Sequence, residues 1–355
     1  MVIIKEVIMT KSRKWVLTRR FFLKSSVSLA AAPFLFAANT MMRAFKDENS
    51  LKKDLLRGTR TSSFSGVAPD ANRKPAPGVR FGMLTDSHYA DIDTRGTRYY
   101  RESISKMHEC IELMNDKQVD FVIQLGDFKN GAPDNNMENL RRFEDVYAKF
   151  SGPRYHVLGN HDMDSISKPQ FMSVIENTGI DKDASYYSFD HGNVRFIVLD
   201  ANFREDGKPY DTGNFSWMDS NIPAVQREWL DNELRSTDRP VIIFIHQLLD
   251  NDEGNHYVRN ASEIRRVLER HTLKLHDDEH CPKVLAVFQG HQHRGQYNLI
   301  NNIHYYTLKA MVEGSGKENN SYAIVELFDD LSIEIKGYRK AVNHTLESIP
   351  AEVQG

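Results

Sequence analysis

Cysteine, glycine and proline are all scarce in this sequence of 355 residues. The two cysteines, Cys110 and Cys281, cannot form a disulfide framework or a zinc knuckle, and we expect both to be ordinary buried thiols. With 20 glycines and 12 prolines the chain is not collagen-like, and with 40% hydrophobic residues it is not wholly disordered. The length predicts one large globular domain or two small ones.

An excess of positive charge is missing as well. The formal net charge is −3, although residues 1–37 contain seven Lys or Arg and a single Glu. The remaining chain has 39 basic and 48 acidic residues, which is a net charge of −9. Nucleic-acid affinity depends largely on Lys and Arg at phosphates, so this acidic body predicts no stable nucleic-acid partner. Any phosphate chemistry would need metal ions rather than a basic cradle.

The amino terminus has the order of an export signal. A basic stretch ends in Thr18–Lys24, with the sequence TRRFFLK, and the weakly apolar segment Ser25–Ala38 follows. That segment is shorter than the roughly 20 apolar residues of a transmembrane helix, and serines and a proline interrupt it. Thr18–Lys24 resembles the twin-arginine export motif, which implies a signal peptide over residues 1–37 and the twin-arginine translocase as a partner. A basic amino terminus without a signal function is the alternative.

Such a signal predicts a bacterial protein that is periplasmic or secreted and has no membrane contact after cleavage. An Ala-x-Ala cleavage sequence is not cleanly present near Ala37 and Ala38, so a retained membrane anchor stays open. Residues 38–77 are rich in Lys, Arg, Ser and Asn and have no sustained periodicity. We interpret them as a linker.

From Val79 onward, apolar runs of strand length alternate with amphipathic helical stretches, which predicts a layered α/β fold. We expect strands over Val79–Leu84, Phe121–Leu125, Tyr155–Leu158, Val194–Leu199, Val241–Ile245 and Val284–Phe288. We expect helices over Tyr99–Asn115, Met137–Phe150, Lys168–Asn177, Val225–Leu234 and Ser262–Leu273. The last part predicts an antiparallel meander that completes a second sheet, with short strands over Gln296–Leu299, Ile303–Leu308, Tyr322–Leu327 and Leu331–Lys336.

Side chains that can bind metals follow five of these strands. They are, in chain order, Asp86 and His88, Asp127, the run Asn160-His161-Asp162, His246, and the pair His291 and His293. A single Asp-x-His or Gly-Asp would more simply be a turn or a cap. Five such motifs in succession predict one common site, because functional groups in open α/β sheets gather at the carboxyl ends of strands.

The order of the motifs resembles that of the calcineurin-like metallophosphoesterases, over roughly Val79–Tyr338. The motifs of that family are Asp-x-His, Gly-Asp, Gly-Asn-His-Asp, His and Gly-His-x-His, and all five are complete here. The resemblance implies a four-layer αββα sandwich of two mixed β-sheets, which we place at residues 78–340, with a tail over 341–355. It also implies a hydrolase that cleaves phosphomonoester, phosphodiester or nucleotide pyrophosphate bonds.

The resemblance further implies two divalent metal ions. One would be bound by Asp86, His88, Asp127 and His293, and the other by Asp127, Asn160, His246 and His291, so that Asp127 bridges them. Imidazole and carboxylate ligands suit Mn, Fe or Zn, whereas a site built only from oxygens would suit Mg or Ca. A hydroxide activated by the metals is the expected nucleophile.

His161 is the expected catalytic residue that does not bind a metal. It would donate a proton to the leaving oxygen or stabilise developing negative charge, and Asp162 would fix its tautomer. The alternative is that His161 caps a helix and Asp162 is a surface acid. We expect the remaining histidines, His256 and His304 included, to be structural.

Departures from relatives narrow the choice of chemistry. Purple acid phosphatases have a metal-binding Tyr three residues after the Gly-Asp aspartate, and Asn130 at that position argues against a charge-transfer iron site. The loop Asn202–Pro223 contains several aromatic residues that either stack on a nucleobase or cover the core. Asp250–Asn260 is the other candidate specificity loop.

Together these features predict an exported, dinuclear phosphoesterase that acts on a small phosphorylated substrate such as a nucleotide. A cyclic-nucleotide phosphodiesterase, an ADP-ribose or CDP-alcohol pyrophosphatase and a broad phosphomonoesterase all remain open. A non-catalytic scaffold on the same fold is an alternative, although such proteins typically lose His161 or several ligands. A nuclease would be expected to have a basic strip near the site.

Overall fold

The computed structural model describes residues 76–349, except 252, 253, 255 and 276–278. The predicted signal peptide and nearly all of the predicted linker lie outside the described residues, as does the end of the predicted tail. No helix within the described part is long and apolar enough to cross a membrane. Cys110 is a free, buried thiol, as expected, and the side chain of Cys281 lies outside the described part.

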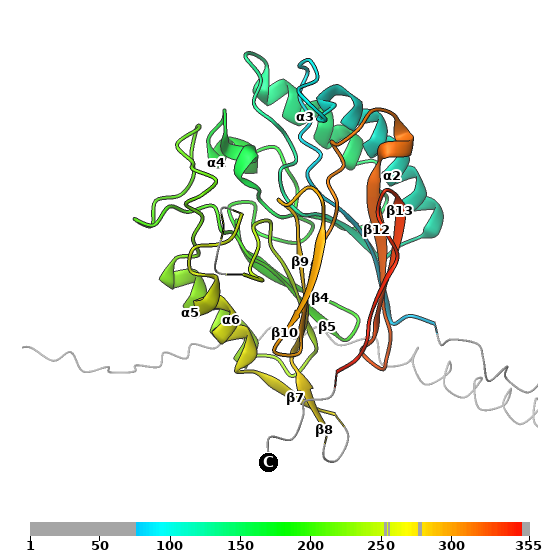
Figure 1. The fold of residues 1–355 in the computed structure, drawn as a ribbon, viewed down its shortest axis with the longest axis vertical. Helices are drawn as coiled ribbons and strands as arrows, with labels where there is room; N and C mark the ends of the chain where they lie inside the picture. The colour runs from blue at the N-terminus through cyan, green and yellow to red at the C-terminus, as the bar shows by residue number, and fades with distance from the viewer. Residues whose placement is uncertain (1–75, 252–253, 255, 276–278, 350–355) are drawn as a thin grey trace, which may run out of the picture. The chain divides into compact units, whose positions relative to one another are not determined.

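Two six-stranded mixed sheets form the centre of the fold (Figure 1). Sheet 1 has the order β14-β13-β12-β1-β2-β3, with β1 (Val79–Leu84), β2 (Phe121–Gln124), β3 (Arg154–His156), β12 (Ser321–Leu327), β13 (Ile333–Arg339) and β14 (His344–Leu346). Sheet 2 has the order β10-β11-β9-β6-β5-β4, with β4 (Tyr187–His191), β5 (Val194–Val198), β6 (Val241–Phe244), β9 (Val284–Gln289), β10 (Gln296–Ile300) and β11 (Ile303–Thr307). A separate hairpin joins β7 (Thr272–Leu275) to β8 (Glu279–Pro282).

The central strands are apolar at nearly every position because both of their faces are buried. Successive side chains of a strand point to opposite faces. In β1, Phe81 and Met83 belong to the core between the two sheets, and in β6, Phe244 does the same. The neighbouring Ile243 instead packs in the core beneath the helices of sheet 2. The continuous apolar runs of the sequence therefore mark strands that lie between two layers.

Helices cover the outer face of each sheet. On sheet 1 these are α2 (Ser103–Lys117), α3 (Asn136–Tyr147) and α4 (Lys168–Met172), whose apolar residues share a core with β1 and β2. On sheet 2 they are α5 (Ala224–Arg235) and α6 (Ala261–Glu269). Figure 1 shows α2 beside β12 and β13, with α5 and α6 on the opposite side of the molecule. The four-layer αββα architecture predicted above is confirmed.

The carboxyl-terminal strands differ from the predicted meander. β10 and β11 extend sheet 2, with β11 parallel to β9, whereas β12 and β13 cross to sheet 1, where β12 is antiparallel to β1. The single meander is therefore wrong, because hydrophobic alternation marks a strand but does not say which sheet edge it joins. β14 lies within residues 341–355, so the chain that we expected to be a tail begins with an edge strand.

Candidate metal centre

The predicted ligands meet at one edge because their strands run parallel within each sheet. β1, β2 and β3 are parallel neighbours in sheet 1, and β6 and β9 are parallel neighbours in sheet 2. Their carboxyl ends deliver the metal-competent side chains to the same place, as expected for open α/β sheets. Three groups form there in which one donor atom from each residue lies within 4.8 Å of the others, namely Asp86-His88-His293, His88-Asp127-His161 and Asp127-His246-His291.

The backbone turns sharply where it delivers these ligands. Asp86, His88, Asp127 and His291 all have left-handed φ values, between 45° and 68°. Such values are uncommon for residues other than glycine and cluster at functional sites, where the surrounding structure holds them. Gly159 allows the closest approach, since a Cβ atom there would collide with the backbone nitrogen of Asp127.

The first group of donors lies between β1 and β9. The Nε2 atom of His88 is 3.7 Å from Oδ1 of Asp86 and 3.4 Å from Oδ2 of Asp127. The Nε2 atom of His293 is 3.4 Å from Oδ1 of Asp86 and 3.2 Å from Nε2 of His88. Four donor atoms thus converge on one small volume.

The second group shares Asp127 with the first. Its Oδ2 atom is 3.2 Å from Nε2 of His246, and that nitrogen is 3.2 Å from Nδ1 of His291. Because this one oxygen faces histidines of both groups, Asp127 is placed to bridge two cations. Asn160 lines the same cavity as Asp127 and His291.

Unpartnered buried atoms show that this donor set suits two cations. Oδ1 of Asp86 and Oδ1 of Asn160 have no hydrogen-bond partner, although buried polar atoms are normally paired. The other oxygen of Asp86 is satisfied, since it accepts hydrogen bonds from the hydroxyl of Thr85 at 2.7 Å and the backbone N–H of His291 at 3.0 Å. Nitrogen and carboxylate donors of this kind match divalent transition metals.

Two pairs of histidines, His88 with His293 and His246 with His291, have pKa values that also suit metal binding. Burial disfavours the charged form, yet nearby carboxylates raise the pKa of both His246 and His293 to about 9. Burial lowers the pKa of His88 to about 4 and that of His291 to about 3. A divalent cation would displace protons from these nitrogens on binding, because metal ligands must be deprotonated.

Hydrogen-bond acceptors behind the ligands fix their orientation. His246 donates from Nδ1 to the carbonyl of Leu125 at 2.7 Å, and His293 donates from Nδ1 to Oε1 of Glu313 at 2.6 Å. Nδ1 of His88 lies 3.3 Å from Oδ1 of Asn130, the position where purple acid phosphatases have their tyrosine. Such acceptors hold the tautomer that leaves Nε2 free for a metal.

The partner of His161 differs from the one that the sequence suggested. Nδ1 of His161 lies 3.1 Å from Oδ2 of Asp164, and Lys129 donates to the other oxygen of that carboxylate at 2.6 Å. Asp162 is buried, and its oxygens accept backbone N–H bonds from Gly159, Phe128 and Lys129. The role predicted for Asp162 is therefore wrong, because its carboxylate ties the Gly159 turn to the loop after β2 and does not contact the ring of His161.

Two adjacent cavities that share lining residues lie over the donors. The smaller, of about 210 Å³, is lined by four of the metal donors, Asp127, Asn160, His291 and His293, together with His161, Arg98, Trp217 and His256. The larger, of about 610 Å³, shares Arg98, His256, His291 and His293 with it. His256, which we expected to be structural, thus borders both cavities, and its Nδ1 atom is buried without a partner.

The aromatic loop Asn202–Pro223 contributes to both the core and this cavity. Tyr210 is buried and donates its hydroxyl to the carbonyl of Ser216 at 2.8 Å. Phe215 packs against His161, and Trp217 lies against His256 with ring centroids 5.2 Å apart. The loop therefore covers the core with some of its rings and presents Trp217 to the cavity.

A model of the family "Calcineurin-like phosphoesterase" matches residues 79–295, which is more than half of the chain. The chain is a calcineurin-like phosphoesterase. It is thus a metal-dependent phosphoric ester hydrolase, with donors for two divalent ions.

Curated relatives of this phosphoesterase include a manganese-dependent ADP-ribose/CDP-alcohol diphosphatase of Oryza sativa subsp. japonica. It is 25% identical over 311 residues, covering 75% of this chain and 92% of the relative. A serine/threonine-protein phosphatase, CPPED1 of Bos taurus, is 24% identical over 240 residues, covering 63% of this chain and 69% of the relative. Among solved structures, a dimetal phosphatase from Danio rerio has 22% identity and a TM-score of 0.66, covering 77% of this chain and all of the other.

Three residues of the phosphoesterase site escaped the sequence motifs. Glu313 and Asp164 each hold a histidine, and Arg98 lines both cavities. None of them comes directly after one of the strands that the sequence predicted. Only Asp164 could have been found from the sequence. It is three residues after His161, and in a helical turn that spacing brings its carboxylate within reach of the histidine ring.

Proposed function

We propose that this phosphoesterase is a manganese-dependent diphosphatase that cleaves the phosphoanhydride bond of a nucleoside diphosphate joined to a sugar or an alcohol. In that reaction a water oxygen attacks one phosphorus atom and the P–O–P bridge breaks. The products are a nucleoside monophosphate and a phosphorylated sugar or alcohol.

The relatives support this substrate class. Manganese-dependent ADP-ribose/CDP-alcohol diphosphatases from rice, Arabidopsis thaliana and Danio rerio match between 72% and 76% of this chain and between 92% and 98% of their own lengths. The similarity therefore extends beyond the metal-binding motifs to nearly the whole of each relative.

The two adjacent cavities, which share four lining residues, are the observation that carries the proposal. A monoester needs room on one side of the reacting phosphorus, whereas a diphosphate joined to a second group needs room on both. The 210 Å³ cavity at the donors shares Arg98, His256, His291 and His293 with the 610 Å³ cleft, so the two lie side by side. This space is in the range of ordinary small-ligand sites.

The protein residues position the reaction. Two divalent ions, when bound, supply Lewis-acid stabilisation of phosphoryl oxygens and make a water molecule acidic. The residues Asp86, His88, Asp127, Asn160, His246, His291 and His293 would hold them. His161, whose Nδ1 atom lies beside Asp164, lines the cavity and would give a proton to the departing phosphate oxygen.

The test is turnover by purified protein loaded with manganese. ADP-ribose and CDP-choline should be cleaved with a higher kcat/KM than 4-nitrophenyl phosphate, and chromatography should show AMP and CMP as products. Chelation with EDTA and the Asp127→Asn variant are the controls. A clear preference for monoesters, with no nucleoside monophosphate formed from ADP-ribose, would contradict the proposal.

We also propose that the protein is exported by the twin-arginine translocase. Support comes from the TRRFFLK sequence of Thr18–Lys24 and the apolar segment that follows it. The mature protein would then act in the periplasm or outside the cell, or would stay anchored if the signal is not removed.

A further inference from the structure

Cationic side chains gather in the larger cleft although the chain as a whole is acidic. Arg98, Arg294 and Lys309 line it, and among the lining residues that the structure describes Glu313 is the only acid. The body of the chain beyond residue 37 has a net charge of −9, so this local excess runs against the overall charge. Overall charge alone led us to expect phosphate chemistry without a basic cradle, and the cleft differs from that expectation.

Glu313 is already engaged by a histidine. Its Oε1 atom accepts a hydrogen bond from Nδ1 of His293 at 2.6 Å. Nε of Arg98 forms an ion pair with the same oxygen at 3.8 Å, a separation that is too long for a hydrogen bond. The guanidinium of Arg98 therefore still has N–H donors for a second acceptor.

The backbone around Arg98 is held in place on both sides. Its N–H and C=O pair with Arg95 at 3.1 and 3.2 Å, and the N–H of Tyr99 donates to the carbonyl of Val312 at 3.0 Å. The segment opposite is anchored by Lys106, whose fully buried ammonium donates to the carbonyls of Met311 and Gly314 at 2.8 and 2.7 Å. Because this backbone is already ordered, binding at Arg98 loses less conformational entropy.

Arg98 also borders the 210 Å³ cavity that contains Asp127, Asn160 and His161. An anion bound to Arg98 would thus lie next to a phosphoryl group at the metal donors. Arg is well suited to phosphate because its planar fork of N–H groups matches two oxygens at once. Lys309 and Arg294 add positive charge farther into the cleft.

We infer that this cleft is a second anion subsite, in which Arg98, supported by Lys309 and Arg294, binds the phosphoryl group that is not attacked. The ligand class is a diphosphate whose two phosphoryl groups span the metal centre and Arg98. The inference rests on the proposed diphosphatase function, and it names the residues that distinguish a diphosphate from a monophosphate ester.

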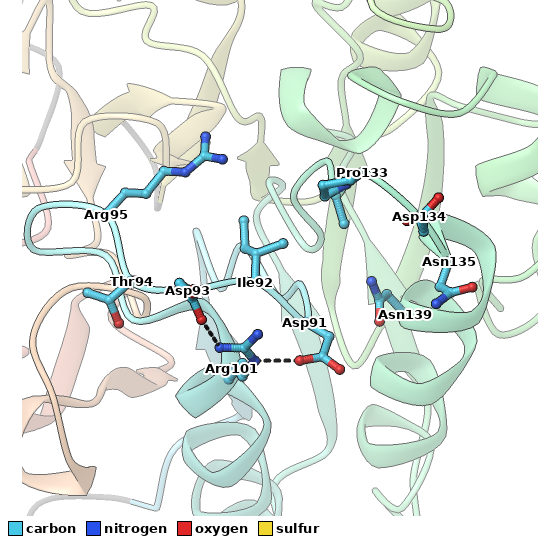
Figure 2. A pocket seen from close by; sticks show the side chains of 11 residues that line it. Asp91, Ile92, Asp93, Thr94, Arg95, Arg101, Pro133, Asp134, Asn135 and Asn139 are labelled. Carbon is cyan, nitrogen blue, oxygen red and sulfur yellow. Dashed lines mark hydrogen bonds and ion pairs between the residues drawn. The ribbon is translucent and has the colours of Figure 1, made fainter.

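Arg95 provides a matched control on the same loop. It lines a different cavity, of about 580 Å³, together with acids that include Asp91 and Asp93. Figure 2 shows Arg101 between those two carboxylates and the side chain of Arg95 extending away from them. Arg95→Gln therefore removes the same charge from the same loop without changing the cleft.

Binding is the first measurement, because it does not depend on turnover. Calorimetry on the manganese-loaded protein would compare methylenediphosphonate with methylphosphonate. The wild type should bind the diphosphonate at least about tenfold more tightly, and Arg98→Gln should reduce that preference by about 10- to 100-fold. Arg95→Gln should change it by less than about threefold, and metal content should stay the same in both variants.

Kinetics give the second measurement. Arg98→Gln should lower kcat/KM for ADP-ribose by a similar factor and leave kcat/KM for a 4-nitrophenyl ester of a nucleoside monophosphate nearly unchanged. Lys309→Gln should act in the same direction with a smaller effect, and it serves as the second variant if Arg98→Gln fails to fold.

The outcomes separate the two proposals. If the wild type does not cleave ADP-ribose but Arg98→Gln still loses the preference for the diphosphonate, the subsite stands and the proposed substrate is wrong. If the wild type cleaves ADP-ribose and Arg98→Gln and Lys309→Gln affect both ligands equally or not at all, the subsite is wrong and the diphosphatase function stands.

Discussion

The carboxylate of Asp164 lies 3.1 Å from Nδ1 of His161, although Asp162 is nearer to His161 in the sequence. The same carboxylate accepts hydrogen bonds from Lys129 at 2.6 Å and from the backbone N–H of Gly131 at 2.7 Å. Asp164 is thus held by two independent donors, and it orients the ring that borders the metal centre. We regard it as a positioning residue for His161.

Replacing Asp164 by Asn should lower kcat while leaving both metals in place. The loss should be about 10- to 100-fold, which is smaller than the 10²- to 10⁴-fold loss expected for His161→Ala as a proton donor. Both losses should shrink for substrates with a good leaving group such as 4-nitrophenol. Steady-state kinetics with good and poor leaving groups, together with metal analysis, would check this; equal losses on both would indicate charge stabilisation instead of proton transfer.

Asp162→Asn is the matched comparison for Asp164→Asn, and it should lower the free energy of unfolding. Asp162 accepts three backbone N–H bonds, and an amide has only one oxygen to do so, leaving at least one buried N–H without an acceptor. A cost of about 1–3 kcal/mol in the free energy of unfolding follows. Thermal and denaturant unfolding would measure it, and an unchanged stability would contradict the role that we assign to this carboxylate.

Replacing Glu313 by Gln should weaken one metal site more than the other. Glu313 accepts a hydrogen bond from Nδ1 of His293 at 2.6 Å. Loss of such a carboxylate behind a metal-binding histidine typically lowers metal affinity or activity by about 10- to 100-fold, and we expect a loss of this size here. Metal titration should show one ion bound about as in the wild type and the other bound more weakly. Equal weakening of both ions would mean that His293 does not serve one site alone.

The residues that the sequence revealed share a local origin. Asp127 and His246 come directly after buried apolar strands, so the strand pattern and the motif were sufficient to place them at one sheet edge. Glu313 could not be found in this way, since it reaches His293 only after the chain has formed β10 and β11. Such contacts depend on which strands become neighbours.

The same reason explains the error in the carboxyl-terminal strands. The apolar alternation of Ile303–Thr307 and Ser321–Leu327 is typical of strands in either sheet, and only the tertiary pairing places β11 beside β9 and β12 beside β1. β4 was missed because Tyr187–His191 is only partly buried, with Asp190 exposed. Weak burial leaves a weak hydrophobic pattern.

Replacing Asp127 by Asn should abolish turnover and weaken the binding of both metals. The Oδ2 atom of Asp127 faces His88 at 3.4 Å and His246 at 3.2 Å, so one substitution removes the shared negative charge from both groups of donors. Metal analysis and kinetics would test this on the same preparation. Two tightly bound ions per chain with normal turnover would show that Asp127 does not bridge the centre.

The last prediction concerns export. The metal centre is assembled from side chains that follow five separate strands, so it can bind ions tightly only after the chain has folded. The twin-arginine route transports folded proteins, so the metals could be bound in the cytoplasm before export. There the supply of each metal, rather than its intrinsic affinity for the site, would decide which ion is bound. Changing both Arg19 and Arg20 to Lys should therefore leave an active, metal-loaded enzyme in the cytoplasm, with little activity outside it.

Cell fractionation with activity and metal assays would check this prediction. Normal export of the double variant would contradict the export proposal, and so would a retained protein that is folded but without metal. Neither result would bear on the phosphoesterase activity.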